Sequence, residues 1–102
     1  MRVGHIEVAQ REIAEFCRRN GIRKLALFGS VLTERFSETS DVDVLVEFKP
    51  EQHVGYFRMA AMERELSALF GGRRIDLRTP SELSPYFRDE AVKNAAVQYA
   101  AQ

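Results

Sequence analysis

The sequence has little of what several classes of protein need. It contains one cysteine, Cys17, which excludes an intramolecular disulfide bond and a cysteine metal cluster. No hydrophobic run approaches the ~20 apolar residues of a membrane-spanning helix. Fifteen basic and fifteen acidic residues cancel, so no net electric field draws the protein to nucleic acid or to a membrane surface. These absences indicate a soluble protein without covalent reinforcement.

What remains is the composition of an ordinary globular domain. The chain has 102 residues, of which 45% are hydrophobic and 29% charged, so we predict a single domain over residues 1–102. Residues 1–10 contain no apolar stretch, so no signal peptide is expected and the predicted location is the cytoplasm. Cys17 falls on the apolar face of a predicted helix and is expected to be a small core residue.

Hydrophobic spacing predicts alternating helices and strands. Apolar residues recur at helical spacing in some segments and form short runs or two-residue alternations in others. The predicted helices are residues 5–20, 31–36 (brief), 56–70 and 85 toward the end, and the predicted strands are residues 23–28, 41–48 and 74–79. This order is typical of an α+β or layered α/β fold: a small mixed sheet of about three to four strands, with helices covering one face.

Three of the four aspartates occupy positions that suggest one site. Asp41 and Asp43 lie two residues apart at the start of a predicted strand, so both carboxylates point to the same face. Asp76 lies between two apolar residues in another predicted strand. Clustered carboxylates repel unless a cation lies between them, and Mg²⁺ takes such oxygens while leaving positions open for substrate phosphates. Gly29-Ser30, after a buried strand, offers backbone N–H groups and a hydroxyl to those phosphates.

Each of these residues also has a structural interpretation. The Gly-Ser pair can be a turn and helix cap, and Asp41 can open its strand as an Asx turn. Asp43 is harder to explain, because a carboxylate inside an apolar strand is costly without a partner. Asp76 repeats the anomaly, although Arg74 or Arg78 could form a structural ion pair with it. Two strands that each carry an aspartate in mid-run favour one shared cation site.

These segments together resemble the DNA polymerase β-type nucleotidyltransferase superfamily and, within it, the minimal nucleotidyltransferase (MNT) antitoxins. The spaced Gly-Ser and Asp-x-Asp pair is the most specific part of the likeness, which covers nearly the whole chain. The segments that carry it are Leu27-Phe28-Gly29-Ser30, residues 40–48, Ile75-Asp76-Leu77 and Leu83-Ser84-Pro85-Tyr86. The resemblance implies the nucleotidyltransferase fold and a nucleotidyltransferase enzyme.

The resemblance also implies a role for each site residue. Asp41 and Asp43 would bind two Mg²⁺ ions together with the triphosphate of ATP. Asp76 would complete the metal site and act as, or help to position, the base for the attacking hydroxyl. Gly29 and Ser30 would hold the β- and γ-phosphates. Transfer would then be an in-line attack on the α-phosphorus with pyrophosphate leaving.

The sequence departs from the family pattern just after the Gly-Ser pair. Family members usually continue with a small residue followed by arginine and glycine, whereas this chain has Leu32, Thr33 and Glu34 at the corresponding positions. An acidic residue therefore stands near the expected triphosphate. Arg35 follows two residues after Thr33, over half a helical turn away. The departure predicts weaker triphosphate binding or a changed nucleotide preference.

A protein acceptor fits this small chain better than a nucleic acid does. The balanced charge offers no basic tract for counterion release, so no direct nucleic-acid binding is expected. MNT proteins pair with HEPN-domain toxins, which are RNases. The resemblance therefore implies an antitoxin that transfers AMP from ATP to a tyrosine of a HEPN partner and forms a hetero-oligomer with it.

Two other functions stay open at the level of sequence. The first is an MNT-fold protein with weak or no catalysis that neutralises its toxin by binding alone. Candidate docking residues are aromatic, a type enriched at interfaces, although the core or core edge is the preferred interpretation of each: Tyr56, Phe57, Tyr86 and Phe87. The second is modification of a small molecule, for which the sequence shows no acceptor-binding domain.

Overall fold

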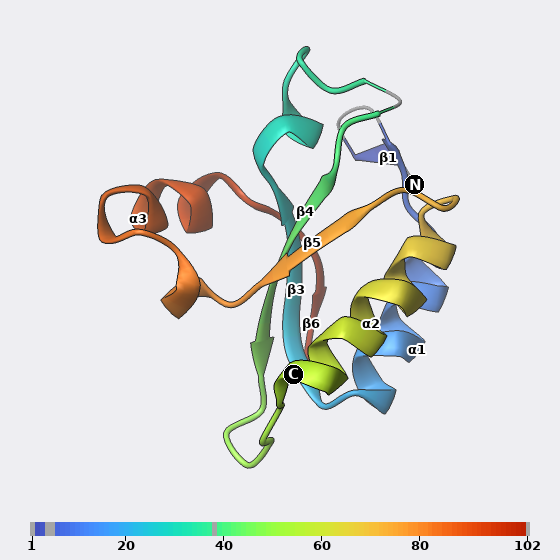
Figure 1. Cartoon of the computed structure of the whole chain (residues 1–102), viewed down its shortest axis with the longest axis vertical. Coiled ribbons are helices and arrows are strands. Elements are labelled where there is room, and N and C mark those ends of the chain that lie inside the picture. Colours follow the sequence, from blue (N-terminus) through green and yellow to red (C-terminus); the bar gives the residue numbers. More distant parts are fainter. Residues whose placement is uncertain (1, 4–5, 38, 102) are drawn as a thin grey trace.

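A four-stranded mixed sheet runs through the middle of the molecule, with helices on both of its faces (Figure 1). The computed structural model describes residues 2–3, 6–37 and 39–101. The strands are β3 (Ile22–Phe28), β4 (Val42–Phe48), β5 (Ile75–Arg78) and β6 (Ala96–Ala100), in the spatial order β5-β4-β3-β6. β4 pairs in parallel with β5, and β3 pairs antiparallel with both β4 and β6. The expected α+β fold with a small mixed sheet is confirmed.

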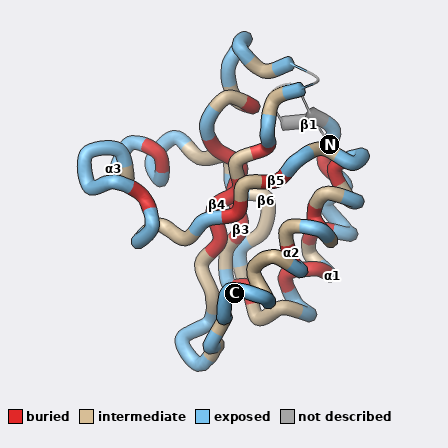
Figure 2. Tube along the Cα trace, in the orientation of Figure 1, coloured by how far each residue is buried: buried red, intermediate tan, exposed pale blue. Residues whose placement is uncertain are grey.

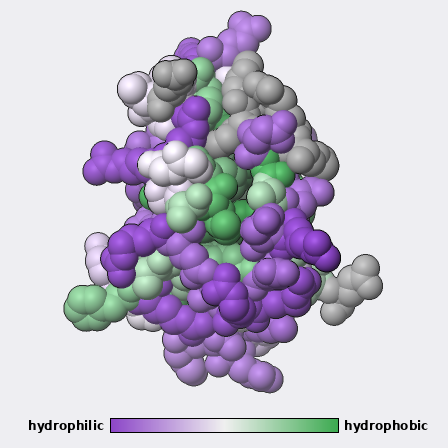
Figure 3. Space-filling model, turned by 90° about the vertical axis from the view of Figure 1, so that its right-hand side faces the viewer, coloured by the Kyte–Doolittle hydropathy of each residue, from purple (hydrophilic) through white to green (hydrophobic). Residues whose placement is uncertain are grey.

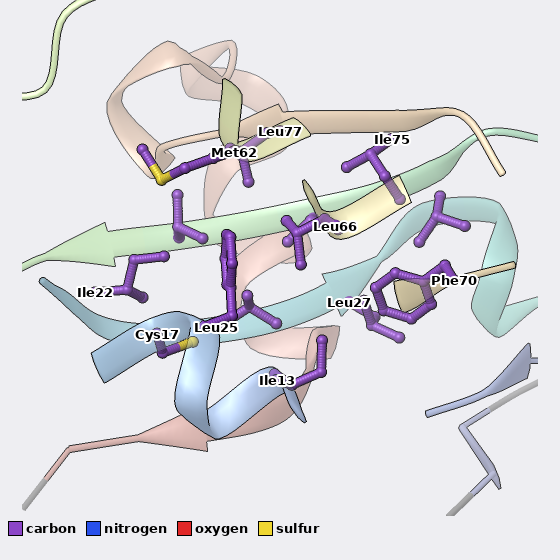
Figure 4. Packing of buried hydrophobic residues seen from close by; sticks show 14 of the residues in the cluster. Ile13, Cys17, Ile22, Leu25, Leu27, Met62, Leu66, Phe70, Ile75 and Leu77 are labelled. Atoms are coloured by element: carbon purple, nitrogen blue, oxygen red, sulfur yellow. The ribbon is translucent and has the colours of Figure 1, made fainter. Parts of the chain in front are cut away.

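The valines that alternate along β4 decide which face of this strand is buried. Val42, Val44 and Val46 are fully buried on one face, where the helices α1 (Gln10–Arg19) and α2 (Tyr56–Leu69) cover the sheet. Figure 4 shows side chains of both helices meeting those of the strands in one apolar layer. Burial is concentrated where strands and helices meet (Figure 2). This layer fixes the sheet, so that the polar residues of the same strands fall on the opposite face.

The second face of the sheet is also covered, which corrects the expectation of helices on one face. Helix α3 (Pro85–Asn94) and the short 3₁₀ helix η2 (Pro80–Glu82) lie there. A small apolar cluster holds α3 and the segment after η2 against β3 and β4, and it consists of Phe28, Leu45, Leu83 and Ala91. The physical reason is that Phe28 and Leu45 interrupt the polar face with apolar area that must be buried.

Both terminal helices are shorter than predicted. Helix α1 begins at Gln10, and Ile6–Glu7 (β2) instead pairs antiparallel with Arg2–Val3 (β1), while residue 5 lies outside the described residues. The last helix ends at Asn94, and β6 follows it. Strand β6 occupies an edge of β3 that would otherwise expose unpaired backbone groups. Tyr99, which was expected on the helix, packs from β6 against the main core.

The brief helix expected at 31–36 is a single 3₁₀ turn over Gly29–Leu32, named η1. Thr33 caps its C-terminal end, and the backbone N–H and side-chain hydroxyl of Thr33 both donate to the Ser30 carbonyl at 2.9 Å. The same residue that replaces the family's arginine therefore closes the turn after Gly-Ser.

The core interpretation is wrong for Tyr56, Phe57 and Tyr86, whereas Phe87 lies at the core edge, with its ring centroid 6.4 Å from that of buried Phe28. Tyr56 and Phe57 at the start of α2 are 90% and 92% exposed, and Tyr86 and Phe87 in α3 are 98% and 47% exposed. Figure 3 views the molecule from the side of α1 and α2, where hydrophilic side chains form most of the surface and hydrophobic ones gather near the middle. Among the described residues no helix combines the length and hydropathy needed to cross a membrane.

Cys17 is a core residue, as predicted. Its side chain is fully buried, and this burial raises the pKa of the thiol to about 12. We expect the folded protein to resist iodoacetamide at pH 8, because the thiol is both protonated and inaccessible. Mass spectrometry should show full alkylation only when urea is added. Rapid alkylation of the folded protein would contradict the observed packing of α1.

Candidate active site

The predicted site residues meet at one end of the sheet, where β3 ends and β4 and β5 begin. Phe28, the last residue of β3, is paired with Asp43 in β4, and Asp43 is paired with Asp76 in β5. Adjacent strands lie about 4.8 Å apart, so the two carboxylates leave neighbouring positions on the same face. Val42 and Leu77 point to the opposite, buried face, as the alternation predicted. The sheet register therefore brings together two acids that are 33 residues apart in the sequence.

The Gly29-Ser30 turn contacts the Asp43 carboxylate directly. Gly29 has φ of +75°, and a Cβ at this position would collide with the carboxylate of Asp43. The backbone N–H of Ser30 donates a hydrogen bond to Asp43. Only glycine allows both the left-handed backbone conformation and the close approach. The turn and the first carboxylate are thus parts of one site.

The electrostatics of Asp43 indicate a place for a cation. Partial burial raises the pKa of the Asp43 carboxyl above its ordinary value, and the negative charges of Asp76 and Asp41 raise it further. The Arg78 guanidinium and the Ser30 N–H act in the opposite direction but do not reverse the shift. A divalent cation among these oxygens would favour the ionised form of the carboxyl.

Asp76 also forms an ion pair with Arg78, the structural interpretation that the sequence left open beside cation binding. The Nε–H of Arg78 donates to both carboxylate oxygens of Asp76, at 3.1 and 3.3 Å. Both side chains remain more than a third exposed, so the pair contributes little to stability. The pair orients Asp76 without removing it from the site, because the register with Asp43 holds independently of the ion pair.

Asp41 is the least constrained of the three acids. It is exposed and lies one residue before β4, near enough to Asp43 to raise its pKa. In the part of the chain that the structure describes, no three acidic, histidine or cysteine side chains are already gathered as a metal cage. The donor set of carboxylate oxygens nevertheless suits Mg²⁺, which keeps open positions for water and phosphate. Asp43 and Asp76 are the pair best placed to hold such an ion.

Two cavities open from this end of the sheet. One, of about 330 Å³, contains Gly29, Asp43 and Asp76 together with residues of η2 and α3. The other, of about 400 Å³, lies between the Gly29-Ser30 turn and α3 and is lined by Thr33 and Arg35 among others. Arg35 is the one cation among the described residues that line it. The two cavities together offer room beside the turn for a nucleotide.

The sequence did not indicate that Leu83 and Phe87 line the site, although Phe87 was a candidate docking residue. Phe87 lines both cavities, and Leu83 lines the one that contains the two acids. Neither carries a chemical group that would mark it as functional. The available signal was the Leu83-Ser84-Pro85-Tyr86 segment, which is part of the family resemblance but was not expected to line the site.

Fold and site together define a small domain for phosphate chemistry, in which a glycine turn and two aligned carboxylates share the end of a mixed sheet. Residues 10–97 match the nucleotidyltransferase domain family. The chain therefore belongs to that family and is a nucleotidyltransferase, as the motifs had indicated.

Individual relatives agree with this assignment. The chain is 38% identical over 69 residues to the protein adenylyltransferase MntA of Thermococcus cleftensis. The matched segment is 68% of this chain and 67% of that protein. A solved structure described as a candidate minimal nucleotidyltransferase is 28% identical, with a TM-score of 0.68 over 84% of this chain and 85% of that one. A toxin–antitoxin structure with AMP-PNP shares the fold, with a TM-score of 0.72 at 18% identity over 93% of this chain and 76% of that one.

Proposed function

We propose that this protein is the antitoxin of a HEPN/MNT toxin–antitoxin pair, and that it transfers AMP from ATP to a tyrosine hydroxyl of its HEPN RNase partner. It would act in the cytoplasm, where ATP is supplied, and form a hetero-oligomer with that partner. The observation that carries the proposal is the pairing of Asp43 with Asp76 beside the Gly29-Ser30 turn. The name of the Thermococcus relative and the AMP-PNP of the toxin–antitoxin structure support it.

Each residue of the site has a task in this reaction. Gly29, with its backbone N–H, and Ser30, with its hydroxyl, hold the β- and γ-phosphates, because the Ser30 N–H is already bonded to Asp43. Asp41, Asp43 and Asp76 would be the ligands for Mg²⁺. When bound, the metal ions neutralise charge on the triphosphate and on the leaving pyrophosphate. Asp76 accepts or directs the proton of the tyrosine hydroxyl. The tyrosine oxygen then bonds to the α-phosphorus, the bond from that phosphorus to the bridging oxygen breaks, and pyrophosphate leaves.

The test is transfer of AMP to the partner. The purified protein, Mg²⁺ and ATP are mixed with the HEPN-domain protein encoded beside it, and the partner is weighed by mass spectrometry. We expect a gain of one or more AMP units on a tyrosine and loss of RNase activity. No gain in mass with an active, folded preparation would contradict the proposal.

Arg35 is expected to replace the missing family arginine in binding the triphosphate. Its side chain lines the cavity that Gly29 and Ser30 also line. We predict that Arg35→Ala raises the KM for ATP by about tenfold with little change in kcat. The lost contact between the guanidinium and the triphosphate would stabilise the bound substrate and the transition state equally. Isothermal titration with AMP-PNP should show the same loss. Arg64→Ala, exposed on α2, is the matched control. An unchanged KM would exclude this role.

Neutralisation by binding alone is the second candidate function. The exposure of Tyr56, Phe57 and Tyr86 favours it, because monomeric proteins seldom leave several large aromatic side chains in water without a partner. The replacement of the usual Arg-Gly by Thr33 and Glu34 also favours it. An experiment in cells distinguishes AMP transfer from neutralisation by binding alone. If an Asp43→Asn protein still neutralises the toxin, binding carries the function.

A further inference from the structure

A third cavity, of about 450 Å³, lies around the outer edge of β5. Its walls come from the start of α2, β5 and η2, and Tyr56, Met59, Ala60 and Glu63 contribute from α2. It shares Asp76 and Arg78 with the cavity that contains Asp43. We propose that this acceptor cavity receives the side chain that is to be modified, an inference that rests on the proposed function.

The direction of the reaction carries the argument. In-line displacement needs the attacking and leaving oxygens on opposite sides of the phosphorus. In the proposed reaction pyrophosphate leaves toward the Gly29-Ser30 turn at the end of β3. From that turn the carboxylates follow in the order Asp43 on β4 and Asp76 on β5. A line from the turn through Asp43 and Asp76 crosses β3, β4 and β5 in that order and reaches the outer edge of β5. The acceptor cavity is the space found there, so it lies on the side from which the hydroxyl must approach.

The lining of the acceptor cavity suits an aromatic hydroxyl. Met59 and Ala60 provide an apolar surface, and Met59 has the flexible side chain that adapts to a ring. Tyr56, which is 90% exposed, stands on the rim, where it can stack against an incoming residue. Asp76 forms the polar end. A phenol that packs on the apolar surface would therefore present its oxygen toward the Asp76 carboxylate.

The charges around the acceptor cavity select the surrounding peptide. Glu63, Asp76 and Glu82 line it together with one cation, Arg78, which is paired with Asp76. One oxygen of Glu63 accepts the backbone N–H of Leu77 at 3.0 Å, which fixes this carboxylate at the edge of β5. The excess of negative charge complements a basic segment. We therefore assign as occupant a tyrosine flanked by lysine or arginine on the partner protein.

A matched pair of substitutions on α2 tests the acceptor cavity. Ala60 lines it, whereas the adjacent Ala61 is exposed and lies outside it. We expect Ala60→Trp to fill the cavity and lower AMP transfer to the HEPN partner by about 100-fold, because the hydroxyl is misplaced. Binding of AMP-PNP with Mg²⁺, measured by calorimetry, should stay within about twofold of the wild-type value. Ala61→Trp should match the wild type in both measurements.

The outcomes separate this inference from the proposed function. Transfer at the wild-type rate by Ala60→Trp would overturn the acceptor cavity alone. A wild-type protein that binds AMP-PNP but never modifies its partner would overturn the proposed function and this inference with it. If Ala60→Trp does not unfold cooperatively on heating, a benzoylphenylalanine at position 56 replaces it, with one at position 61 as control. Photo-crosslinks from position 56 to the basic segment around the modified tyrosine support the acceptor cavity, and crosslinks elsewhere or none overturn it.

Discussion

Asp43→Asn is expected to lower the rate of AMP transfer by about 1,000-fold or more. Asp43 contacts the Gly29-Ser30 turn on one side and is paired with Asp76 on the other, so it touches both halves of the proposed site. The amide keeps the shape and the acceptor for the Ser30 N–H but loses the negative charge that a divalent cation needs. Catalysis that depends on charge stabilisation is then lost while the geometry is retained.

The same substitution should leave the protein as stable as the wild type, or more so. The folded protein raises the pKa of Asp43, so folding favours the protonated form of this carboxyl. Stability therefore increases as the pH falls through the folded-state pKa toward the lower unfolded value. Above the folded-state pKa the ionised carboxylate opposes folding, because it is partly buried and repelled by Asp76 and Asp41. Asparagine removes that opposition at neutral pH.

Two measurements check this prediction. Transfer is followed with radiolabelled ATP, and thermal unfolding is followed by circular dichroism without Mg²⁺. Asp89→Asn, which changes the fourth aspartate at an exposed position of α3, is the control and should leave both unchanged. An Asp43→Asn protein with most of its transfer activity would rule out the assignment of the site. A large fall in its melting temperature would show that Asp43 is structural.

Gly29→Ala is expected to lower transfer by about 100-fold as well as destabilise the fold. The φ of +75° costs a residue with a Cβ about 1–3 kcal/mol. The new Cβ would in addition push the Asp43 carboxylate away from the turn. A displacement of about 1 Å in a reacting site is enough for a loss of this size. Both effects arise from one methyl group.

Gly71→Ala separates the two effects. Gly71 follows α2 with a similar φ of +71°, but a Cβ there would meet nothing within 4 Å. Urea unfolding should show a loss of stability for both variants, at least as large for Gly29→Ala because of its added contact with Asp43, while only Gly29→Ala should lose transfer activity. Equal activity in both variants would mean that the contact between Gly29 and Asp43 has no part in the reaction.

The positions of the candidate site residues could be predicted from the sequence because the relevant pattern lies within each strand. An aspartate in the middle of an apolar strand is anomalous whatever the tertiary structure, and Asp43 and Asp76 both have that signature. Two-residue alternation then fixed the face on which each would lie. The pairing of Asp43 with Asp76 was only inferred, because strand register depends on contacts between segments far apart in the chain.

The parts that could not be predicted depend on tertiary context. The segment Ala96–Ala100 has helical apolar spacing continuous with α3, and only the free edge of β3 makes it a strand. The exposed aromatic residues are another case. Tyr56 and Tyr86 are aromatic residues of a type often found in cores. Whether each is buried depends on how α2 and α3 are rotated about their axes against the sheet. Neither rotation is set by a short motif.

The position of β5 at the margin of the sheet bears on how the enzyme chooses its target. This strand has only four residues, and the Asp76 side chain is 36% exposed. In the proposed reaction an acceptor would reach Asp76 from the outer edge of the sheet, so a tyrosine on a fully folded protein could be used as readily as one on a flexible peptide. Discrimination by size is weak in such an arrangement. Besides the charges of the acceptor cavity, fidelity would then depend on how long a partner stays docked, and an antitoxin bound to its own toxin would gain selectivity from its residence time.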